Sequence, residues 1–466
     1  MSEVTTVLTT TIESLRRRLL GVHQDHKRIA RSALILLGFV LAGKIVSASK
    51  EMMIAYRYGI SGTVDAYQLA LTLVTWVPVT LTSELGPLLV PSLINLRKDK
   101  AKKNQFLGEL EGLALAVGIL FAVLLCLLWP HLGGLVSGNL SDSTRKMCRE
   151  MIIGMAPVGI LAFTICISAS RLQACEKHIN TLLECVPAIA LLGFVLAARS
   201  NTSVLPLILG TTVGFVIQAA VLRALARRAD TVHAFPRLSL KSSQWPATFR
   251  AMGILLFGAV IGNLAGPVDQ YFLAHRGDGA IATLGYANRL LSLLLGMGAL
   301  AISRATLPII SEILFLGDHA RARSTALKWS LLMLAVGAIG ACMAYALAPY
   351  AIALLFQRGA FTSQDTVAVT SSFRAGLVQI PFAFAVWVLV QLFVSEARFK
   401  VISITAVFGF FIKLAGNIVL VPLFGINGVL LATGLGTAAV FLGCLLCVRF
   451  SPEGTRIDPG SRAGDD

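Results

Sequence analysis

Apolar runs of about 20 residues recur from Ala33 almost to the C-terminus, each long enough to cross a hydrocarbon core of roughly 30 Å. Lipid offers the backbone no hydrogen-bond partners, so such runs form helices or a closed barrel. They are too long and too uniformly apolar for barrel strands. Only 14% of residues are charged, against about 25% in soluble proteins, and the mean hydropathy is +0.78. The sequence therefore predicts an all-α polytopic membrane protein of about twelve transmembrane helices.

Charged residues follow the positive-inside pattern, since almost every even-numbered link between the expected spans is basic while most odd-numbered links hold few charges. The net charge of +16 thus indicates membrane topology and not nucleic-acid binding. This pattern predicts a multi-pass protein of the bacterial inner membrane with both termini in the cytoplasm. The expected spans are 31–57, 65–95, 106–134, 147–171, 179–199, 203–224, 247–275, 281–311, 325–356, 366–395, 400–421 and 426–449.

The long basic sixth-to-seventh link separates two related halves. Arg57 and Tyr67 correspond to Arg276 and Tyr286 at a constant offset of 219 (276 − 57, 286 − 67). Because six helices separate equivalent positions, the repeat is parallel and predicts two six-helix lobes around a central cavity, working by alternating access. The expected domains are a cytoplasmic tail (1–30), an N-terminal lobe (31–224), a cytoplasmic linker (225–246), a C-terminal lobe (247–450) and a second cytoplasmic tail (451–466).

The sequence holds no convincing motif for nucleotide binding, metal binding or catalysis. Residues 1–30 form either an amphipathic helix on the membrane surface or a disordered basic tail. The run Gly38 to Ile45 nearly matches a P-loop, but it lies inside an apolar helix and lacks the Ser or Thr that holds magnesium. Cys444 and Cys447 form a C-x-x-C within the last apolar helix, where core packing is expected. We therefore expect no enzyme activity, no bound metal and no organic cofactor.

The first span carries Lys44, Lys50, Glu51 and Arg57 among apolar residues. A charge at mid-membrane costs about 2.5–3.5 kcal/mol on insertion scales, so these side chains must face protein or water. Lys44 and Glu51 are seven residues apart and thus nearly on one helix face. The four charges indicate either cations lining a cavity for an anionic ligand, or a Lys44–Glu51 ion pair with interface anchors.

Polar residues in other spans extend this cavity. By the repeat, Arg289 is expected to meet the cations of the first helix across the cavity. Gly258, Gly262 and Gly266, followed by Pro267, predict a close helix–helix face and a kink. Asp269 then serves either ion or proton coupling, or simply pairs with Arg276. The remaining cavity or coupling candidates are Glu51, Asp65, Glu84 and Asn288.

These residues carry a resemblance to a known family. The stretch from Gly43-Lys44 to Gly59, then Val64 to Tyr67, and Tyr286-Ala-Asn-Arg289 are similar to the MurJ/MviN family of the multidrug/oligosaccharidyl-lipid/polysaccharide exporter superfamily. The most specific match is Leu355 to Thr362, which resembles that family's L-F-x-R-G-x-F segment. The similarity extends to about residue 440.

The resemblance implies a lipid II flippase that moves an undecaprenyl-diphosphate-linked muropeptide to the outer leaflet. It implies that Lys44, Lys50 and Arg289 bind the diphosphate, and that sodium bound in the second lobe would meet Asp269, Asn417 and Thr437. Coupling to protons or to the membrane potential stays open. Partners would be membrane lipids and envelope-biosynthesis proteins. The sequence departs from the family at residues 76–79 (Trp-Val-Pro-Val), which lack the arginines expected in the second helix.

Three functions stay open at this point. The first is a flippase for lipid II or for another polyprenyl-diphosphate saccharide, such as an O-antigen or exopolysaccharide unit. The second is a multidrug/cation antiporter, for which acidic cavity residues would be expected. The third is a non-transporting scaffold, which the lost second-helix arginines favour and the costly intramembrane cations disfavour.

Overall fold

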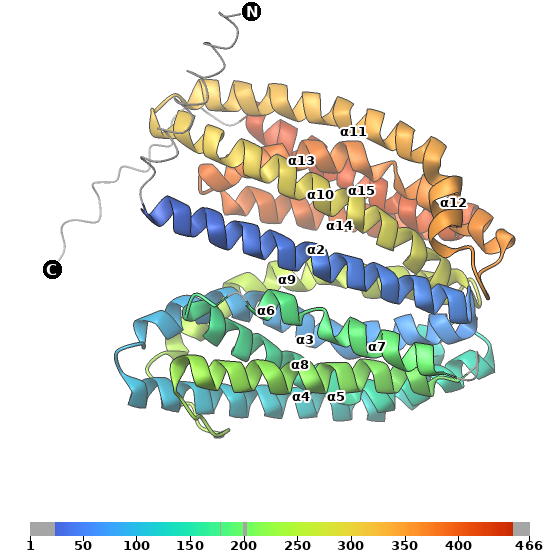
Figure 1. The fold of residues 1–466 in the computed structure, drawn as a ribbon. Helices are drawn as coiled ribbons and strands as arrows, with labels where there is room; N and C mark the ends of the chain where they lie inside the picture. Colours follow the sequence, from blue (N-terminus) through green and yellow to red (C-terminus); the bar gives the residue numbers. More distant parts are fainter. Residues whose placement is uncertain (1–23, 178, 199–202, 451–466) are drawn as a thin grey trace, which may run out of the picture.

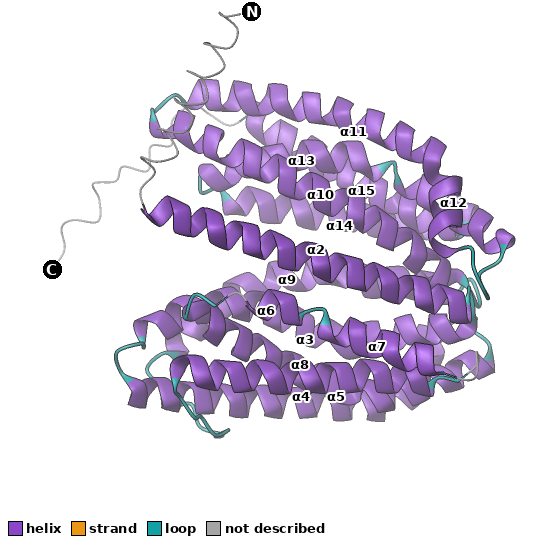
Figure 2. Ribbon diagram, viewed as in Figure 1, coloured by secondary structure: helices purple, strands orange, loops and turns teal. Residues whose placement is uncertain are grey.

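The computed structural model describes residues 24–177, 179–198 and 203–450, and within them every regular element is a helix (Figures 1 and 2). The terminal tails predicted at 1–30 and 451–466 lie largely or wholly outside the described residues. The helices are α2 (Gln24–Tyr58), α3 (Gly62–Asn95), α4 (Lys100–Ser137), α5 (Asp142–Ala174), α6 (Ile179–Leu183), α7 (Val186–Ala197), α8 (Leu205–Asp230), α9 (Trp245–Ala274), α10 (Ala280–Phe315), α11 (His319–Phe356), α12 (Ser363–Gly376), α13 (Gln379–Ser395), α14 (Phe399–Phe424) and α15 (Ile426–Arg449).

The helices are arranged in two groups (Figure 1). The first group holds α3 to α8 and the second holds α10 to α15, with α2 and α9 running between them. Helix α2 contacts α6 and α7 of the first group and α11 of the second, while α9 contacts α3 and α14. These two helices therefore connect the groups, and charged side chains on them lie where the groups meet.

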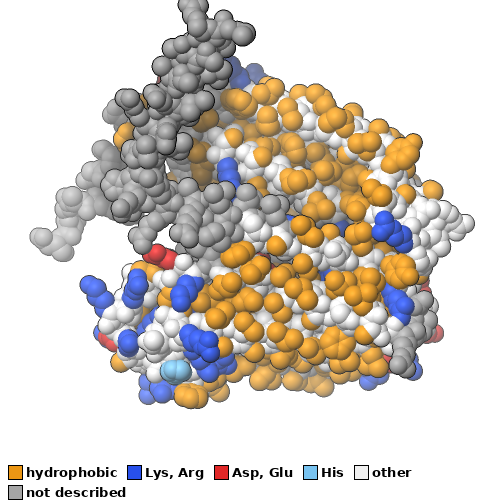
Figure 3. All heavy atoms as spheres, viewed as in Figure 1, with side chains coloured by type: hydrophobic (Ala, Val, Ile, Leu, Met, Phe, Trp, Pro, Cys, Tyr) orange, Lys and Arg blue, Asp and Glu red, His pale blue; other side chains and the backbone are white. Residues whose placement is uncertain are grey.

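The chain is a multi-pass membrane protein by length and composition of its helices. Among the described residues, ten helices are long and apolar enough to span a membrane, or up to eleven if the bent α9 is included. Figure 3 shows apolar side chains covering the visible face, with many Lys and Arg side chains near its ends. The count of about twelve spans stays a prediction, because α2 is interrupted by charges.

Two expected spans are broken and one expected contact is wrong. The span predicted at 179–199 consists of α6 and α7, and that at 366–395 of α12 and α13.

Helix α9 bends by 53° between Gly253 and Gly258, N-terminal to Pro267. A Cβ at Gly258, Gly262 or Gly266 would meet no heavy atom within 4 Å, so the predicted close helix–helix face does not form. The spacing of small residues permitted contact, but no described residue comes within 4 Å of these positions on α9.

The two groups are sealed together at the end where α2 ends and α10 begins. Asp65 of α3 accepts hydrogen bonds from the backbone N–H of Gly279 and of Ala282 (2.6 Å), at the start of α10. Tyr286 donates to the carbonyl of Gly59 (3.0 Å), and the Ala360 N–H to that of Tyr56 (2.8 Å). Within the described chain, most hydrogen bonds between α2–α8 and α9–α15 lie in this half of the molecule; the exception is the indole N–H of Trp245, at the start of α9, which donates to Glu109 of α4.

Close backbone approach makes glycine necessary at this seal. Gly59 has φ +56°, and a Cβ there would lie 2.5 Å from the Ala360 carbonyl oxygen. Gly359 has φ +62°, and a Cβ there would lie 2.4 Å from the Tyr56 carbonyl oxygen. Both positions combine a left-handed backbone with no room for a side chain, so any larger residue would push the groups apart.

Asp65→Ala is expected to open this end, because it removes two charge-assisted hydrogen bonds to a helix N-terminus, each worth about 1.5–3 kcal/mol. The measurement is the distance between spin labels at Ser143 and Ser363, in a background whose eight native cysteines are replaced. We expect a longer-distance population in the variant. Asp142→Ala is the control, since Asp142 is a fully exposed carboxylate at the same end. Equal distance distributions in all three proteins would contradict the role of Asp65.

Candidate functional site

A cavity of about 890 Å³ lies inside the first group and is closed on one side by α2. Lys44 and Lys50 of α2 line it, together with residues of α3, α5, α6, α7 and α8. Lys44 is exposed, and no carboxylate of the described residues lies within salt-bridge distance of it. The cavity therefore offers an anionic ligand at least one ammonium group that no protein carboxylate neutralises.

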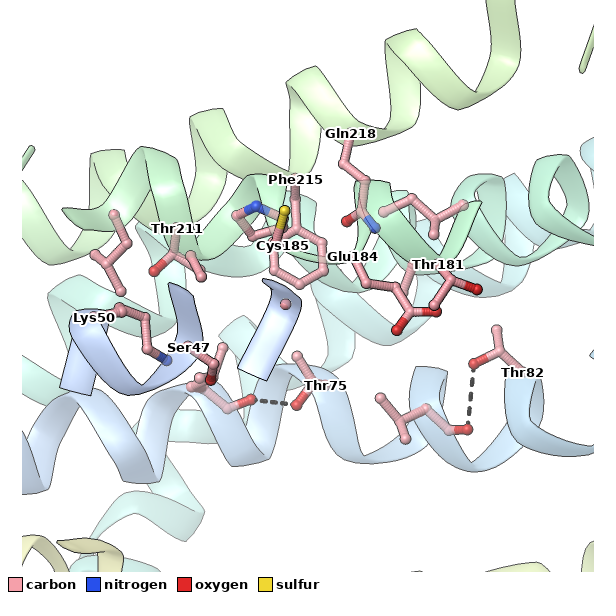
Figure 4. A pocket seen from close by; sticks show the side chains of 18 of the residues that line it. Ser47, Lys50, Thr75, Thr82, Thr181, Glu184, Cys185, Thr211, Phe215 and Gln218 are labelled. Carbon is pink, nitrogen blue, oxygen red and sulfur yellow. Dashed lines mark hydrogen bonds between the residues drawn. The ribbon is translucent and has the colours of Figure 1, made fainter. Parts of the chain in front are cut away.

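Hydroxyl and amide groups line the rest of this cavity (Figure 4). Lys50 and Ser47 lie toward one part of it, and Glu184 and Thr181 toward another. Thr75 and Thr82 of α3 donate their hydroxyl protons to backbone carbonyls of their own helix, so their oxygens retain acceptor capacity. The other polar lining residues are Tyr67, Ser83, Thr211 and Gln218. The lining thus combines cations, the Glu184 carboxylate and neutral hydrogen-bonding groups, which suits a polar headgroup that carries both charge and sugar.

Glu51 joins α2 to α10 through an ion-paired cluster. Its carboxylate lies 2.8 Å from the Lys50 ammonium and 3.0 Å from Nε of Arg289. The Glu51 side chain is 8% exposed and that of Lys50 13%, whereas that of Arg289 is 51% exposed. The Lys44–Glu51 pair considered from the sequence is wrong, because Glu51 turns toward its neighbour and toward α10. Arg289 thus meets the first helix, held by a carboxylate between the two cations.

The other sequence candidates lie apart from this cluster. Arg289 is not part of the cavity lining, and Asn288 beside it is exposed. Glu84 is half-buried on α3 and forms no ion pair with any described residue. Asp65 belongs to the seal between the groups. The structure therefore brings together Lys50, Glu51 and Arg289, with Lys44 further along α2.

A second buried cluster forms between α9 and α14. The Asp269 carboxylate accepts a hydrogen bond from the Lys413 ammonium at 2.7 Å and one from the Asn417 amide at 3.2 Å. Asp269 and Lys413 side chains are 12% and 11% exposed. The alternative partner Arg276 is wrong, since its guanidinium donates to the Val421 carbonyl. A carboxylate inside the apolar part of the chain requires a cation, and Lys413 supplies it.

These residues do not fit a sodium ion. Sodium requires several converging oxygen ligands, yet both oxygens of Asp269 already accept from nitrogen donors. Thr437, the third residue expected there, donates its hydroxyl to the Thr433 carbonyl of its own helix at 2.8 Å and keeps its oxygen lone pairs, so the mismatch rests on the ammonium beside Asp269. No group of three or more His, Cys, Asp or Glu residues that could hold a metal occurs in the described chain. The ammonium of Lys413 occupies the side of Asp269 on which a cation would be bound.

Sequence reasoning missed Lys413 and Glu184. Lys413 is a single cation in the apolar helix α14, so the cost of an unpaired intramembrane charge was a signal that it needs a partner. The partner lies 144 positions away in sequence and cannot be read from local spacing. Glu184 lies at the break between α6 and α7, which the sequence did not predict.

The chain matches the family described as lipid II flippase MurJ over residues 54–454. It belongs to the MurJ family. A Bdellovibrio bacteriovorus protein named "Probable lipid II flippase MurJ" is 27% identical over 249 residues, covering 52% of this chain and about half (46%) of that protein. A Burkholderia cenocepacia protein named "Lipid II flippase MurJ" is 22% identical, covering 89% of this chain and 83% of that protein.

Solved structures agree with this fold. A lipid II flippase MurJ in an inward closed conformation is 20% identical, with a TM-score of 0.74 over 90% of this chain and 88% of that chain. An inward-facing multidrug MATE family transporter is 12% identical, with a TM-score of 0.66 over 90% and 97% of the two chains. The resemblance of the sequence to the MurJ/MviN family is thereby confirmed, and the all-α membrane fold with it.

Proposed function

We propose that this MurJ-family chain is a flippase that translocates an undecaprenyl-diphosphate-linked saccharide, lipid II or a related envelope precursor, from the inner to the outer leaflet. The observation that carries the proposal is the set of cations on α2 and α10. Lys44 and Lys50 line the cavity, and half-exposed Arg289 is held beside Lys50 by Glu51. A diphosphate accepts charge-assisted hydrogen bonds from ammonium and guanidinium groups, which are stronger than bonds between neutral groups.

Alternating access is supported by the distribution of hydrogen bonds between the two helix groups. They concentrate at the end that carries the Gly59–Val64 and Arg276–Ala280 links, which the charge pattern assigns to the outer side. A headgroup would enter from the cytoplasmic side while this seal is closed and leave after it opens. Glu51 would hold Lys50 and Arg289 together until the diphosphate competes for them.

The remaining features of the proposal follow from topology and charge. The protein would lie in the bacterial inner membrane with cytoplasmic termini, among membrane lipids and envelope-biosynthesis proteins. For the driving force we propose protons or the membrane potential in place of sodium, since Lys413 already supplies the cation beside Asp269. A tethered ammonium does not dissociate, so this cluster would not carry sodium through a transport cycle.

A different saccharide on the same diphosphate lipid is the second candidate. The stretch Trp76 to Val79 of α3 carries no cation, and Val79 lines the cavity. Fewer cations there would suit a headgroup with fewer carboxylates than a muropeptide. A multidrug cation antiporter fits less well, because the cations of α2 would repel a cationic drug.

Complementation tests the proposal. Cells depleted of their own lipid II flippase would receive this chain, with membrane insertion checked by immunoblot. We expect growth to be restored. Failure of well-expressed, inserted protein would contradict lipid II as the substrate. Restoration of O-antigen or exopolysaccharide in cells lacking that flippase would then establish the second candidate.

A further inference from the structure

A second pocket, of about 480 Å³, lies between α11 and α12, in the group of helices that does not contain the α2 cavity. Helix α12 is short and begins with a capping box formed by Thr362 and Asp365. It packs against α11 near the C-terminal end of that helix. The residues that line this second pocket are Tyr345, Pro349, Thr366, Val367, Thr370, Ser371, Arg374 and Ala375. None of them lines the cavity beside α2.

The pocket lies at the depth of lipid headgroups. The exposed side of α11 is apolar between Trp329 and Tyr350, which are 47% and 74% exposed. These aromatic residues are 21 positions apart (350 − 329), or about 30 Å of helix, the thickness of a hydrocarbon core. Aromatic side chains favour the two membrane–water interfaces. Tyr345 and Pro349, which line the pocket, therefore lie close to one interface.

A guanidinium is held in place at this pocket. Nε of Arg374 donates to the Tyr345 carbonyl at 3.0 Å, and its guanidinium carbon lies 4.2 Å from the centre of the Tyr345 ring. Among the described residues, no carboxylate lies within salt-bridge distance of Arg374. Only Nε is engaged by the carbonyl, so the terminal nitrogens retain donor capacity. The cation is fixed in orientation and has no protein counter-ion.

A buried hydroxyl lacks a partner at the same place. Thr370 is 6% exposed, lines the pocket, and its Oγ1 makes no hydrogen bond. Buried polar groups are nearly always satisfied, so an unpartnered hydroxyl on a side chain that lines a pocket is a candidate to bind a ligand there. A hydroxyl donor beside an unpaired guanidinium is a typical arrangement for a phosphate oxygen.

We propose that this pocket binds the phosphate of an anionic glycerophospholipid in the leaflet next to α12. The phosphodiester would accept from Arg374 and Thr370, and the acyl chains would lie along the exposed apolar side of α11. The lipid would fasten α12 to the membrane surface. This site is independent of the diphosphate site beside α2, so it holds whichever saccharide is transported.

Lipid binding to the purified full-length protein tests the proposal. Native mass spectrometry would be recorded with phosphatidylglycerol, with zwitterionic phosphatidylcholine, and with phosphatidylglycerol in the presence of inorganic phosphate. We expect one phosphatidylglycerol to bind more tightly than phosphatidylcholine. We expect Arg374→Gln to weaken it about tenfold, the loss of a charge-assisted hydrogen bond. Arg321→Gln is the control, because Arg321 is exposed at the opposite end of α11.

Thr370→Val keeps the shape of the side chain and removes only the hydroxyl, so it serves if Arg374→Gln folds poorly. We expect it to weaken phosphatidylglycerol binding several-fold. Unchanged binding in both variants would overturn the site. Displacement of the lipid by millimolar inorganic phosphate would overturn the lipid assignment and indicate a site for a soluble anion. Equal retention of phosphatidylglycerol and phosphatidylcholine would also overturn the lipid assignment, because the guanidinium would then not distinguish an anionic lipid from a zwitterionic one.

Discussion

Replacing Arg289 by alanine is expected to lower the rate of lipid-linked saccharide translocation at least tenfold at limiting substrate. Arg289 lies 3.0 Å from Glu51 and is half exposed, so it can contact a ligand without leaving the cluster. A charge-assisted hydrogen bond to phosphate contributes about 1.5–3 kcal/mol, which corresponds to a 10- to 150-fold change in affinity. The measurement is growth of flippase-depleted cells, with transport by the purified variant beside it.

Matched variants separate charge from geometry at this position. Arg289→Lys keeps the charge and loses the planar pair of donors, so it should retain part of the activity. Lys50→Ala should resemble Arg289→Ala, because both cations share Glu51. Lys328→Ala, an exposed cation of α11 outside both clusters, should behave as wild type. Full activity of Arg289→Ala and Lys50→Ala would refute the assignment of the diphosphate site.

Lys413→Ala is expected to destabilise the protein by about 3–5 kcal/mol, the effect of removing one partner of a buried ion pair. Asp269 would be left with the Asn417 amide alone, because no other cation of the described residues lies within salt-bridge distance of it. The measurement is thermal unfolding of the detergent-solubilised protein. The double variant Lys413→Ala/Asp269→Asn should regain most of the loss, because it carries no uncompensated charge.

The unfolding temperatures of the wild type and of Lys413→Ala also test whether sodium binds at the Asp269–Lys413 cluster. The unfolding temperature of the wild type should be equal in sodium and potassium chloride of equal ionic strength, because Lys413 supplies the cation. The single variant Lys413→Ala should be stabilised by sodium more than by potassium, if the vacated space admits an ion. A marked stabilisation of the wild type by sodium would contradict our reading of Asp269.

How much of this could be predicted depended on the range of each interaction. Apolar runs and the positive-inside pattern predicted the helices, since both act within one span. The cost of intramembrane charge singled out Lys44, Lys50 and Asp269. The partner of Asp269 was not readable, because it depends on how α9 faces α14. Asp65 illustrates this limit, since its acceptor role depends on the start of α10, 217 positions further along the chain.

Small-residue spacing misled for a related reason. Gly258, Gly262 and Gly266 permit a close approach but do not create one, and among the described residues none lies within 4 Å of a Cβ placed there. Gly59 and Gly359, by contrast, are required by a left-handed backbone where two segments distant in sequence meet. Only the assembled structure distinguishes the two cases.

The most direct test of the central proposal is translocation of lipid II in proteoliposomes that contain the purified protein. Lipid II would be supplied in one leaflet, and its headgroup arriving in the other would be followed with an impermeant enzyme. We predict transfer well above that of protein-free vesicles, and loss of transfer in Arg289→Ala but not in Lys328→Ala. No transfer of lipid II or of any other undecaprenyl-diphosphate saccharide by correctly folded protein would contradict the account.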